Sequence, residues 1–196
     1  MSECKTTSRP FLQGERVYLR ALCKSDLDGP YLDWLNDAEV CAGNSHHVVP
    51  LTHGQASQFI ADSVDRHRAL HLAIVLRDAD RHIGNVALQR IDWVSRSAEL
   101  SILIGEKDFW GQGYGKECCH ILLEHGFRAM NLNRIYLGTY SNNHGMVRVA
   151  EALGMKLEGQ RRQAAFKNGS YLDVLEFGLL KAESEQQIST AERKEV

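Results

Sequence analysis

Three glycines within five residues, Gly111, Gly113 and Gly115, separate two stretches of different periodicity. The stretch before them, residues 97–106 (SAELSILIGE), has the composition of a β-strand. The stretch after them carries apolar residues at the spacing of one helix face, namely Cys119, Leu122, Leu123 and Phe127. A loop with so few side chains lets its backbone approach a ligand closely. Because the N–H groups at the start of the following helix favour an anion, the sequence predicts a strand–loop–helix unit that binds phosphate.

Hydrophobic periodicity elsewhere predicts one α/β domain around a mixed sheet, without an internal repeat. Further strands are expected at residues 15–22, 70–77, 81–93 and 133–140, and in a hairpin over 155–180 that turns at Asn168-Gly169. Helices are expected at residues 24–37, capped by Ser25 and interrupted by Gly29-Pro30, and at 52–70 and 143–154. The domain is predicted to cover residues 14–181, after an N-terminal arm (1–13) and before a polar tail (182–196) that is mobile or weakly helical.

Composition narrows the classes of protein and partner. The 196 residues carry a net charge of −2, which is too weakly basic to indicate nucleic-acid binding. No apolar run approaches the ~18 residues of a membrane span and the N-terminus lacks a secretory signal, so we expect a cytoplasmic protein. His67 and His71 have helical spacing, but no Glu follows His67 as in a zinc-protease motif, and no metal site is predicted.

Three kinds of phosphate loop compete for the glycine-rich segment. A nucleotide-triphosphatase loop needs GxxxxGK[ST], but Lys116 follows Gly111 too soon and Glu117 stands where a magnesium-binding hydroxyl belongs. A dinucleotide-binding loop needs GxGxxG near the first strand, whereas this loop follows several strands. The third kind of loop binds the pyrophosphate of coenzyme A.

Four stretches, in order, favour the coenzyme A loop: AELSILIGE (98–106), FWGQGYGKE (109–117), NNHGMVRVAEALGMKLEG (142–159) and NGSYLDVLEFGLL (168–180). With YLDWLNDAEV (31–40), they resemble the GNAT superfamily of acyl-CoA-dependent N-acetyltransferases over about residues 14–181. The chain is most similar to the branch that contains ribosomal-protein N-terminal acetyltransferases and several amino-sugar and polyamine acetyltransferases. This resemblance implies a mixed, mostly antiparallel central sheet flanked by helices, with a splay between the fourth and fifth strands.

The resemblance also implies an acetyl-CoA site. The backbone of Leu103 and Ile104 would pair with the pantetheine amides, and the side chain of Asn143 would contact the cofactor arm while it caps a helix. The pyrophosphate would lie on backbone N–H groups of the glycine loop, with added charge from the lysine: Gln112, Gly113, Tyr114, Gly115 and Lys116.

For catalysis, the resemblance implies Glu99 as the base that removes a proton from the amine, directly or through water. The alternative for Glu99 is an ion pair with a neighbouring strand. Many relatives carry a tyrosine that protonates the leaving thiolate, but Ala150 occupies that position here. Tyr140 or Ser141 would then donate the proton, or the thiolate leaves without help, since a thiol has a pKa near 8.5.

Residues in the segments that cover the acceptor mouth are candidates for substrate binding: Trp34, Asp37 and Asp92. Carboxylates there would favour a cationic amine, although surface charges of this kind are commonly only solvated. We therefore predict acetyl transfer to a primary amine of a small metabolite, which could be an amino sugar, a polyamine or an aminoglycoside. The alternatives are acetylation of a protein N-terminus, transfer of another acyl group, and a CoA-binding regulatory protein without catalysis. The resemblance also suggests a homodimer.

Overall fold

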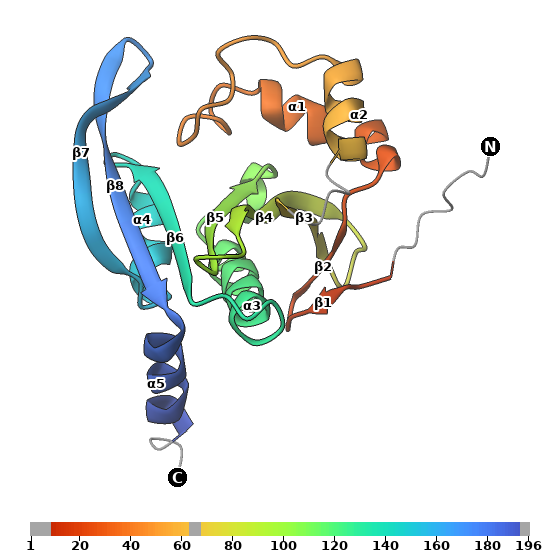
Figure 1. Ribbon diagram of the computed structural model, residues 1–196. Helices are drawn as coiled ribbons and strands as arrows, with labels where there is room; N and C mark the ends of the chain where they lie inside the picture. Colours follow the sequence, from red (N-terminus) through yellow and green to blue (C-terminus); the bar gives the residue numbers. More distant parts are fainter. Residues whose placement is uncertain (1–8, 63–67, 193–196) are drawn as a thin grey trace.

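The computed structural model describes residues 9–62 and 68–192, so His67 lies outside the described residues. Within these ranges one eight-stranded sheet has the order β1-β2-β3-β4-β5-β6-β8-β7, and every neighbouring pair is antiparallel except β5–β6 (Figure 1). The predicted mixed, mostly antiparallel sheet is confirmed. Its strands are β1 (Leu12–Gln13), β2 (Val17–Ala21), β3 (Leu70–Leu76), β4 (His82–Asp92), β5 (Ser97–Ile104), β6 (Arg134–Tyr140), β7 (Lys156–Lys167) and β8 (Ser170–Leu180).

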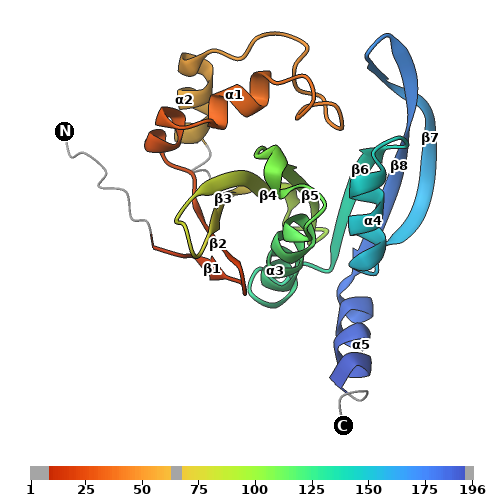
Figure 2. The same cartoon turned by 180° about the vertical axis from the view of Figure 1, so that it is seen from behind.

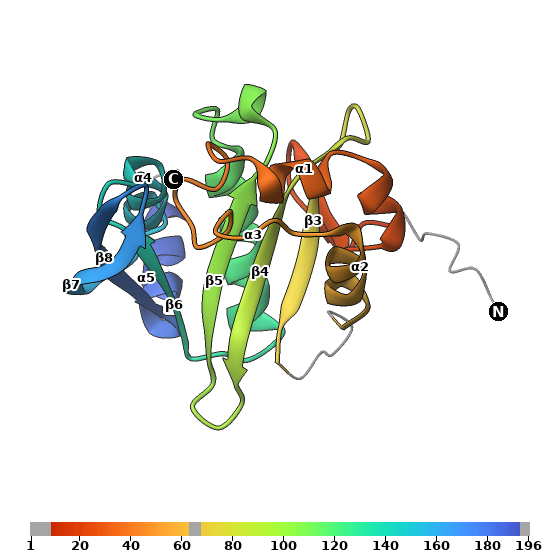
Figure 3. The same ribbon diagram turned by 90° about the horizontal axis from the view of Figure 1, so that it is seen from above.

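Helices flank both faces of this sheet. Figures 1, 2 and 3 show α1 and α2 over one face, with α3 and α4 on the opposite side. The helices are α1 (Tyr31–Asn36), α2 (His53–Asp62), α3 (Tyr114–Arg128), α4 (His144–Ala152) and α5 (Lys181–Glu192), with 3-10 turns at Lys24–Asp28 and Lys107–Phe109. None of the helices in the described ranges is long and apolar enough to cross a membrane.

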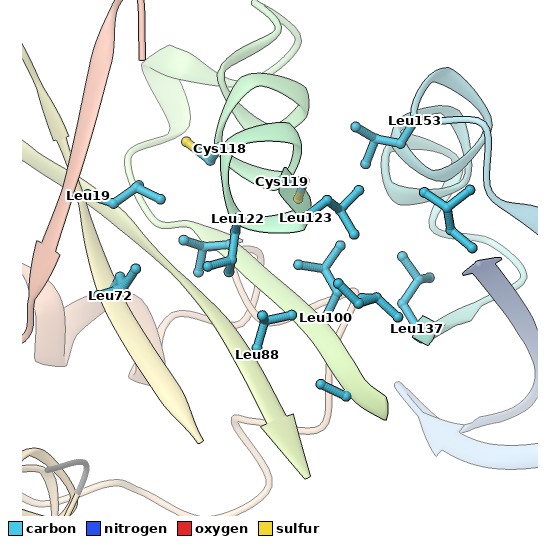
Figure 4. Packing of buried hydrophobic residues seen from close by; sticks show 14 of the residues in the cluster. Leu19, Leu72, Leu88, Leu100, Cys118, Cys119, Leu122, Leu123, Leu137 and Leu153 are labelled. Atoms are coloured by element: carbon cyan, nitrogen blue, oxygen red, sulfur yellow. The ribbon is translucent and has the colours of Figure 1, made fainter. Parts of the chain in front are cut away.

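Strand alternation divides the core into two clusters, one on each face of the sheet. On β3, Leu72 and Ile74 pack on the α3 side, whereas Ala73 and Val75 pack toward α1 and α2. The larger cluster contains the predicted α3 face, which Figure 4 shows against leucines of β2 to β6. Since each fully buried leucine stabilises the fold by about 1.5–3 kcal/mol, this cluster holds α3 firmly on the sheet.

The parallel pair β5–β6 is short. The two strands pair only at Ser97–Arg134, Ala98–Ile135 and Glu99–Tyr136, although β5 continues to Ile104. Beyond Glu99, the edge of β5 that faces β6 forms no ladder with it, while its other edge stays paired with β4. The predicted splay is therefore present between the fourth and fifth long strands.

The predicted cap of the first helical segment needs correction. The expected interruption at Gly29-Pro30 is present, between a 3-10 turn (Lys24–Asp28) and α1, but the turn begins after Cys23 rather than Ser25. The physical reason is Asp26, whose carboxylate accepts the N–H of Cys23 at 2.9 Å and the Arg20 guanidinium at 2.6 Å. At the other end of the domain, β8 runs directly into the polar helix α5 (Lys181–Glu192), which agrees with the helical alternative for the predicted tail.

The hairpin turn is confirmed. Asn168 and Gly169 have φ of 49° and 79°, the left-handed pair that a two-residue turn between twisted strands requires. At the opposite edge, Leu12–Gln13 pair with β2, so the sheet begins two residues before the predicted boundary at residue 14.

Gly105, at the end of β5, offers a stability test. A Cβ atom added there would lie 2.0 Å from Cδ2 of Trp34, which is buried with 4% exposure. We expect Gly105→Ala to lower the free energy of unfolding by about 1–3 kcal/mol, because the indole must move out of a packed site. Gly159→Ala is the matched control, since a Cβ there meets nothing within 4 Å. Equal urea midpoints for the two variants would contradict this packing.

Candidate active site

One cleft lies where β5 leaves β6. Its volume is about 660 Å³, and it is bounded by β5, the glycine loop, the first turns of α4 and the loop after α1. The lining residues on β5 and the glycine loop are Ile102, Leu103, Ile104, Phe109, Trp110, Gly111, Gly113, Tyr114, Gly115 and Lys116. The remaining wall is formed mainly by Glu39, Val40, Gly43, Asn44, Asn143, Met146, Arg148 and Val149.

The glycine loop presents backbone to this cleft. Gly111 and Gly113 have φ of 71° and 86°, in the left-handed region that side chains disfavour. Gly113 is the N-cap of α3 without a side-chain cap, and the N–H of Glu117 makes the first helical bond, to the Gly113 carbonyl at 3.1 Å. The preceding N–H groups of the first turn therefore have no partner within the helix. Together with the helix dipole, they form an anion site.

The side chain of Arg16 binds the glycine loop and the first turn of α3. Its Nε lies 2.8 Å from Glu117 Oε2, and its Nη1 donates to the Gln112 carbonyl at 3.0 Å. The guanidinium also stacks 4.3 Å from the ring centre of Tyr114. Burial raises the pKa of Glu117, but bonds from the Arg16 backbone and side chain outweigh it, so the pKa lies below its ordinary value. Arg16, the residue directly before β2, thus holds the glycine loop, which lies about 100 residues later in the sequence.

The charges that line the cleft are mostly positive. Lys116 comes from the glycine loop and Arg148 from α4. The one carboxylate in the lining, Glu39, is neutralised by Lys107, whose Nζ lies 2.5 Å from its Oε2. The residues around the glycine loop therefore suit an anionic ligand.

Asn143 connects α4 to the loop after α1. Its Oδ1 caps the helix by accepting the N–H of Met146 at 3.1 Å, as predicted. Its Nδ2 reaches toward the Gly43 carbonyl at 3.5 Å, and a Cβ on Gly43 would lie only 2.3 Å from that nitrogen. The loop after α1 can approach α4 this closely because residue 43 is glycine.

Glu99 lies at the vertex of the splay, as part of the last β5–β6 pair. Strand alternation directs it away from α3, beside Tyr136, whose pKa is raised by burial and then by the Glu99 charge. The Nε of Arg90 lies 3.2 Å from Glu99 Oε2, without the alignment of a hydrogen bond. Glu99 therefore lies where the splay opens, outside the described lining of the cleft, and is paired with a cation.

The proposed proton donors lie at the end of β6. Tyr140 shares the face of Tyr136, and burial raises its pKa. Ser141 lies beyond the strand, and its N–H donates to the Asp173 carbonyl at 2.9 Å. Neither residue lines the cleft among the described residues.

The structure does not bring the three predicted acceptor residues to the cleft. Trp34 is buried and donates Nε1 to Glu106 at 3.1 Å, so it supports the start of the glycine loop. Asp37 accepts the N–H of Val40 at 3.0 Å and pairs with Lys107, and these bonds keep its pKa below its ordinary value. The carboxylate of Asp92 bonds within the β4–β5 turn, which Figure 3 shows at the end of the strands opposite the glycine loop.

Several residues of the site were not found from the sequence. Arg148 belongs to a face of α4 that also presents Gly145, Val149 and Ala152, at helical spacing. The helical spacing of these residues could have predicted that they share one face of α4. It could not have predicted that this face borders the cleft. Nothing local in the sequence signals the contact of Arg16 with Glu117.

By contrast, most predicted cofactor residues do surround the cleft: Leu103, Ile104, Gly113, Tyr114, Gly115, Lys116 and Asn143. Gln112 lies outside the lining, with its carbonyl bound by Arg16.

Comparison with known proteins agrees with this geometry. The acetyltransferase (GNAT) domain family matches residues 16–156, so the chain belongs to this family of N-acetyltransferases. It is 30% identical to the uncharacterized N-acetyltransferase p20 of Bacillus licheniformis, over 88% of this chain and 97% of that protein. It is 33% identical to a spermidine N(1)-acetyltransferase of Vibrio cholerae, over 55% of this chain and 62% of that protein.

The fold is also similar to a crystal structure of spermidine N-acetyltransferase from Vibrio cholerae in complex with CoA and spermine. The TM-score is 0.79 at 23% identity, and the match covers 87% of this chain and 98% of that one. At this level of identity the likeness bears on the fold alone.

The Arg16 contacts predict a binding defect. We expect Arg16→Gln to raise the Kd for acetyl-CoA by roughly tenfold, about 1.4 kcal/mol, because the loop loses its charged anchor. Arg128→Gln is the matched control, since Arg128 pairs with Glu124 on the exposed side of α3. Isothermal titration calorimetry would measure both values. An unchanged Kd for Arg16→Gln would show that the loop needs no such anchor.

Proposed function

We propose that this protein transfers an acetyl group from acetyl-CoA to a primary amine of a small metabolite, with polyamines as the first class to test. One observation carries the proposal: an uncapped helix N-terminus on a glycine loop and the unpaired edge of β5 share one cleft. The first feature suits a pyrophosphate and the second suits an amide-bearing chain. Coenzyme A contains both groups, and acetyl-CoA would supply the reactive thioester.

The residues of the cleft fit that ligand. N–H groups of Gly113 to Lys116 would hold the pyrophosphate, and the side chains of Lys116 and Arg148 would balance its charge. The free edge of β5 at Leu103 and Ile104 would pair with the amides of the pantetheine arm. Their side chains need only be apolar, which agrees with their sequence.

The acceptor amine requires a base. An alkyl amine with a pKa of about 10.4 is mostly protonated at pH 7, and its deprotonation costs about 4 kcal/mol. Glu99, at the vertex of the splay, is our candidate for the residue that takes this proton, directly or through water. Arg90 lies against the same carboxylate, with its Nε 3.2 Å from Oε2 of Glu99. The reaction therefore needs Glu99 to separate from Arg90 or to act through water.

The choice of a small amine rests on the comparisons. A spermidine acetyltransferase is among the relatives, whereas Asp37 and Glu39, which could attract a polyamine, are both paired with Lys107. A protein N-terminus remains the alternative acceptor. Ala150, which lacks the hydroxyl that many relatives have, favours a second alternative, a CoA-binding protein without catalysis. A homodimer stays a prediction.

Release of the CoA thiol from acetyl-CoA would distinguish these alternatives. The panel would contain spermidine, amino-sugar nucleotides, aminoglycosides and peptides with free N-termini. We expect turnover with one small-amine class and loss of acetyl-CoA binding in Gly113→Val, because a branched side chain there would obstruct the anion site and is strained at φ 86°. Turnover only with peptides would support the N-terminal alternative. Binding without turnover on any amine would support the non-catalytic one.

The base has a separate test. We expect Glu99→Gln to lower kcat by about 100-fold or more, with the Kd for acetyl-CoA unchanged, because an amide cannot accept the proton. The increase of kcat with pH should flatten in the same variant. Glu124→Gln, which removes an exposed carboxylate of α3, should leave both quantities unchanged. A normal kcat and pH profile in Glu99→Gln would exclude Glu99 as the base.

A further inference from the structure

Two cations in the lining of the cleft have no partner in the protein. Lys116 and Arg148 make neither an ion pair nor a hydrogen bond within the ranges that the structure describes. The remaining charged residue of the lining, Glu39, is bound by Lys107. Many other arginines pair with carboxylates, namely Arg16, Arg20, Arg81, Arg90, Arg128, Arg134 and Arg161. The cleft therefore offers two free positive charges to a ligand.

Arg148 lies on the α4 wall of the cleft, which faces the glycine loop. It belongs to the cleft side of α4 together with Gly145, Met146 and Val149. Figure 2 shows α3 and α4 beside each other, and a Cβ on Gly115 in the first turn of α3 would lie 4.0 Å from Cγ2 of Val149. Arg148 is the preceding residue and is exposed, so it stands at the outer rim of the cleft, beside the anion site of α3.

Gly145 leaves room for the guanidinium of Arg148. Side chains on a helix lean toward its N-terminus, so a residue covers the turn that lies three or four residues before it. For Arg148, that turn contains Gly145. Among the described residues, a Cβ on Gly145 would meet only Asn143 Oδ1, at 3.6 Å. The space beside Arg148 is therefore open, and a ligand in the cleft can reach the guanidinium.

Coenzyme A carries two separate anionic groups. The pyrophosphate would take the N–H groups of Gly113 to Lys116, the dipole of α3 and the charge of Lys116. The second group is the phosphate monoester on the 3′ carbon of the ribose, and such a monoester carries about −1.5 to −2 charges at pH 7. The ribose is joined to the pyrophosphate on the side away from the pantetheine arm. With the arm along β5, the ribose would lie toward the outer rim, where Arg148 is.

We propose that Arg148 binds the 3′-phosphate of coenzyme A and makes the protein selective for coenzyme A over 3′-dephospho-coenzyme A. This inference rests on the proposed function. The guanidinium adds to the positive field at the pyrophosphate but donates its hydrogen bonds to the 3′-phosphate, which its planar fork can hold through two parallel bonds. Because Arg148 is exposed, solvent and salt screen this pair, and the selectivity is moderate.

Isothermal titration calorimetry with two ligands tests this contact. We expect the wild type to bind 3′-dephospho-CoA about tenfold more weakly than CoA. Arg148→Gln should weaken CoA binding by about tenfold and 3′-dephospho-CoA binding by no more than about twofold, because only CoA has the group that loses its partner. The preference for CoA should therefore nearly disappear. The melting temperature of the free protein should not change, since Arg148 is exposed and unpaired.

Two further variants serve as controls. Lys116→Gln should weaken both ligands by a similar factor and preserve the preference, because Lys116 lies at the pyrophosphate that both ligands contain. Arg128→Gln removes the same charge from the exposed side of α3, outside the lining of the cleft, and should leave both Kd values unchanged.

Each contrary outcome has a distinct meaning. Equal Kd values of the wild type for the two ligands would overturn the inference. An equal loss of both ligands in Arg148→Gln would also overturn it, because the guanidinium would then bind the pyrophosphate. So would a preference that is lost in Lys116→Gln and kept in Arg148→Gln. In these cases the proposed function would stand, provided that the wild type binds CoA and acetylates an amine. A wild type that neither binds CoA nor transfers an acetyl group would overturn the proposed function, and this inference with it.

Discussion

β5 and β6 run parallel but pair at only three residue pairs, after which their facing edges separate. Backbone N–H and C=O groups in the interior of a protein need partners, so an edge that opens inside a domain must be met by solvent or by a ligand. In this fold, the glycine loop, α3 and α4 are arranged around that opening, and the cleft lies there. The divergence of two strands thus creates the site, and the apolar cluster beneath α3 keeps the remaining sheet rigid.

Long-range contacts then fix the walls of the cleft. Arg16 anchors the glycine loop to the start of β2, and Trp34 supports the same loop from α1 through Gly105 and Glu106. Lys107 binds Asp37 and Glu39, which joins that loop to the loop after α1. These contacts connect the glycine loop with the loop after α1, and residues of both loops line the cleft.

Local patterns in the sequence were enough to predict most of the fold. The strand composition of residues 97–106, the helix face from Cys119 to Phe127 and the Asn168-Gly169 turn depend on neighbouring residues, and the structure confirms each. The acceptor residues could not be predicted in this way. Burial of Trp34 depends on its contact with Gly105, and Asp92 looks like a free carboxylate until its bonds within the turn are known.

The central claim is that the splay of β5 and β6 and the N-terminus of α3 hold one molecule of coenzyme A. A crystal structure of the protein with CoA would test it most directly. We predict the pyrophosphate on the backbone N–H groups of Gly113 to Lys116 and the pantetheine arm along Ile102 to Ile104. CoA bound elsewhere, or a ligand that leaves the edge of β5 uncovered, would contradict the account.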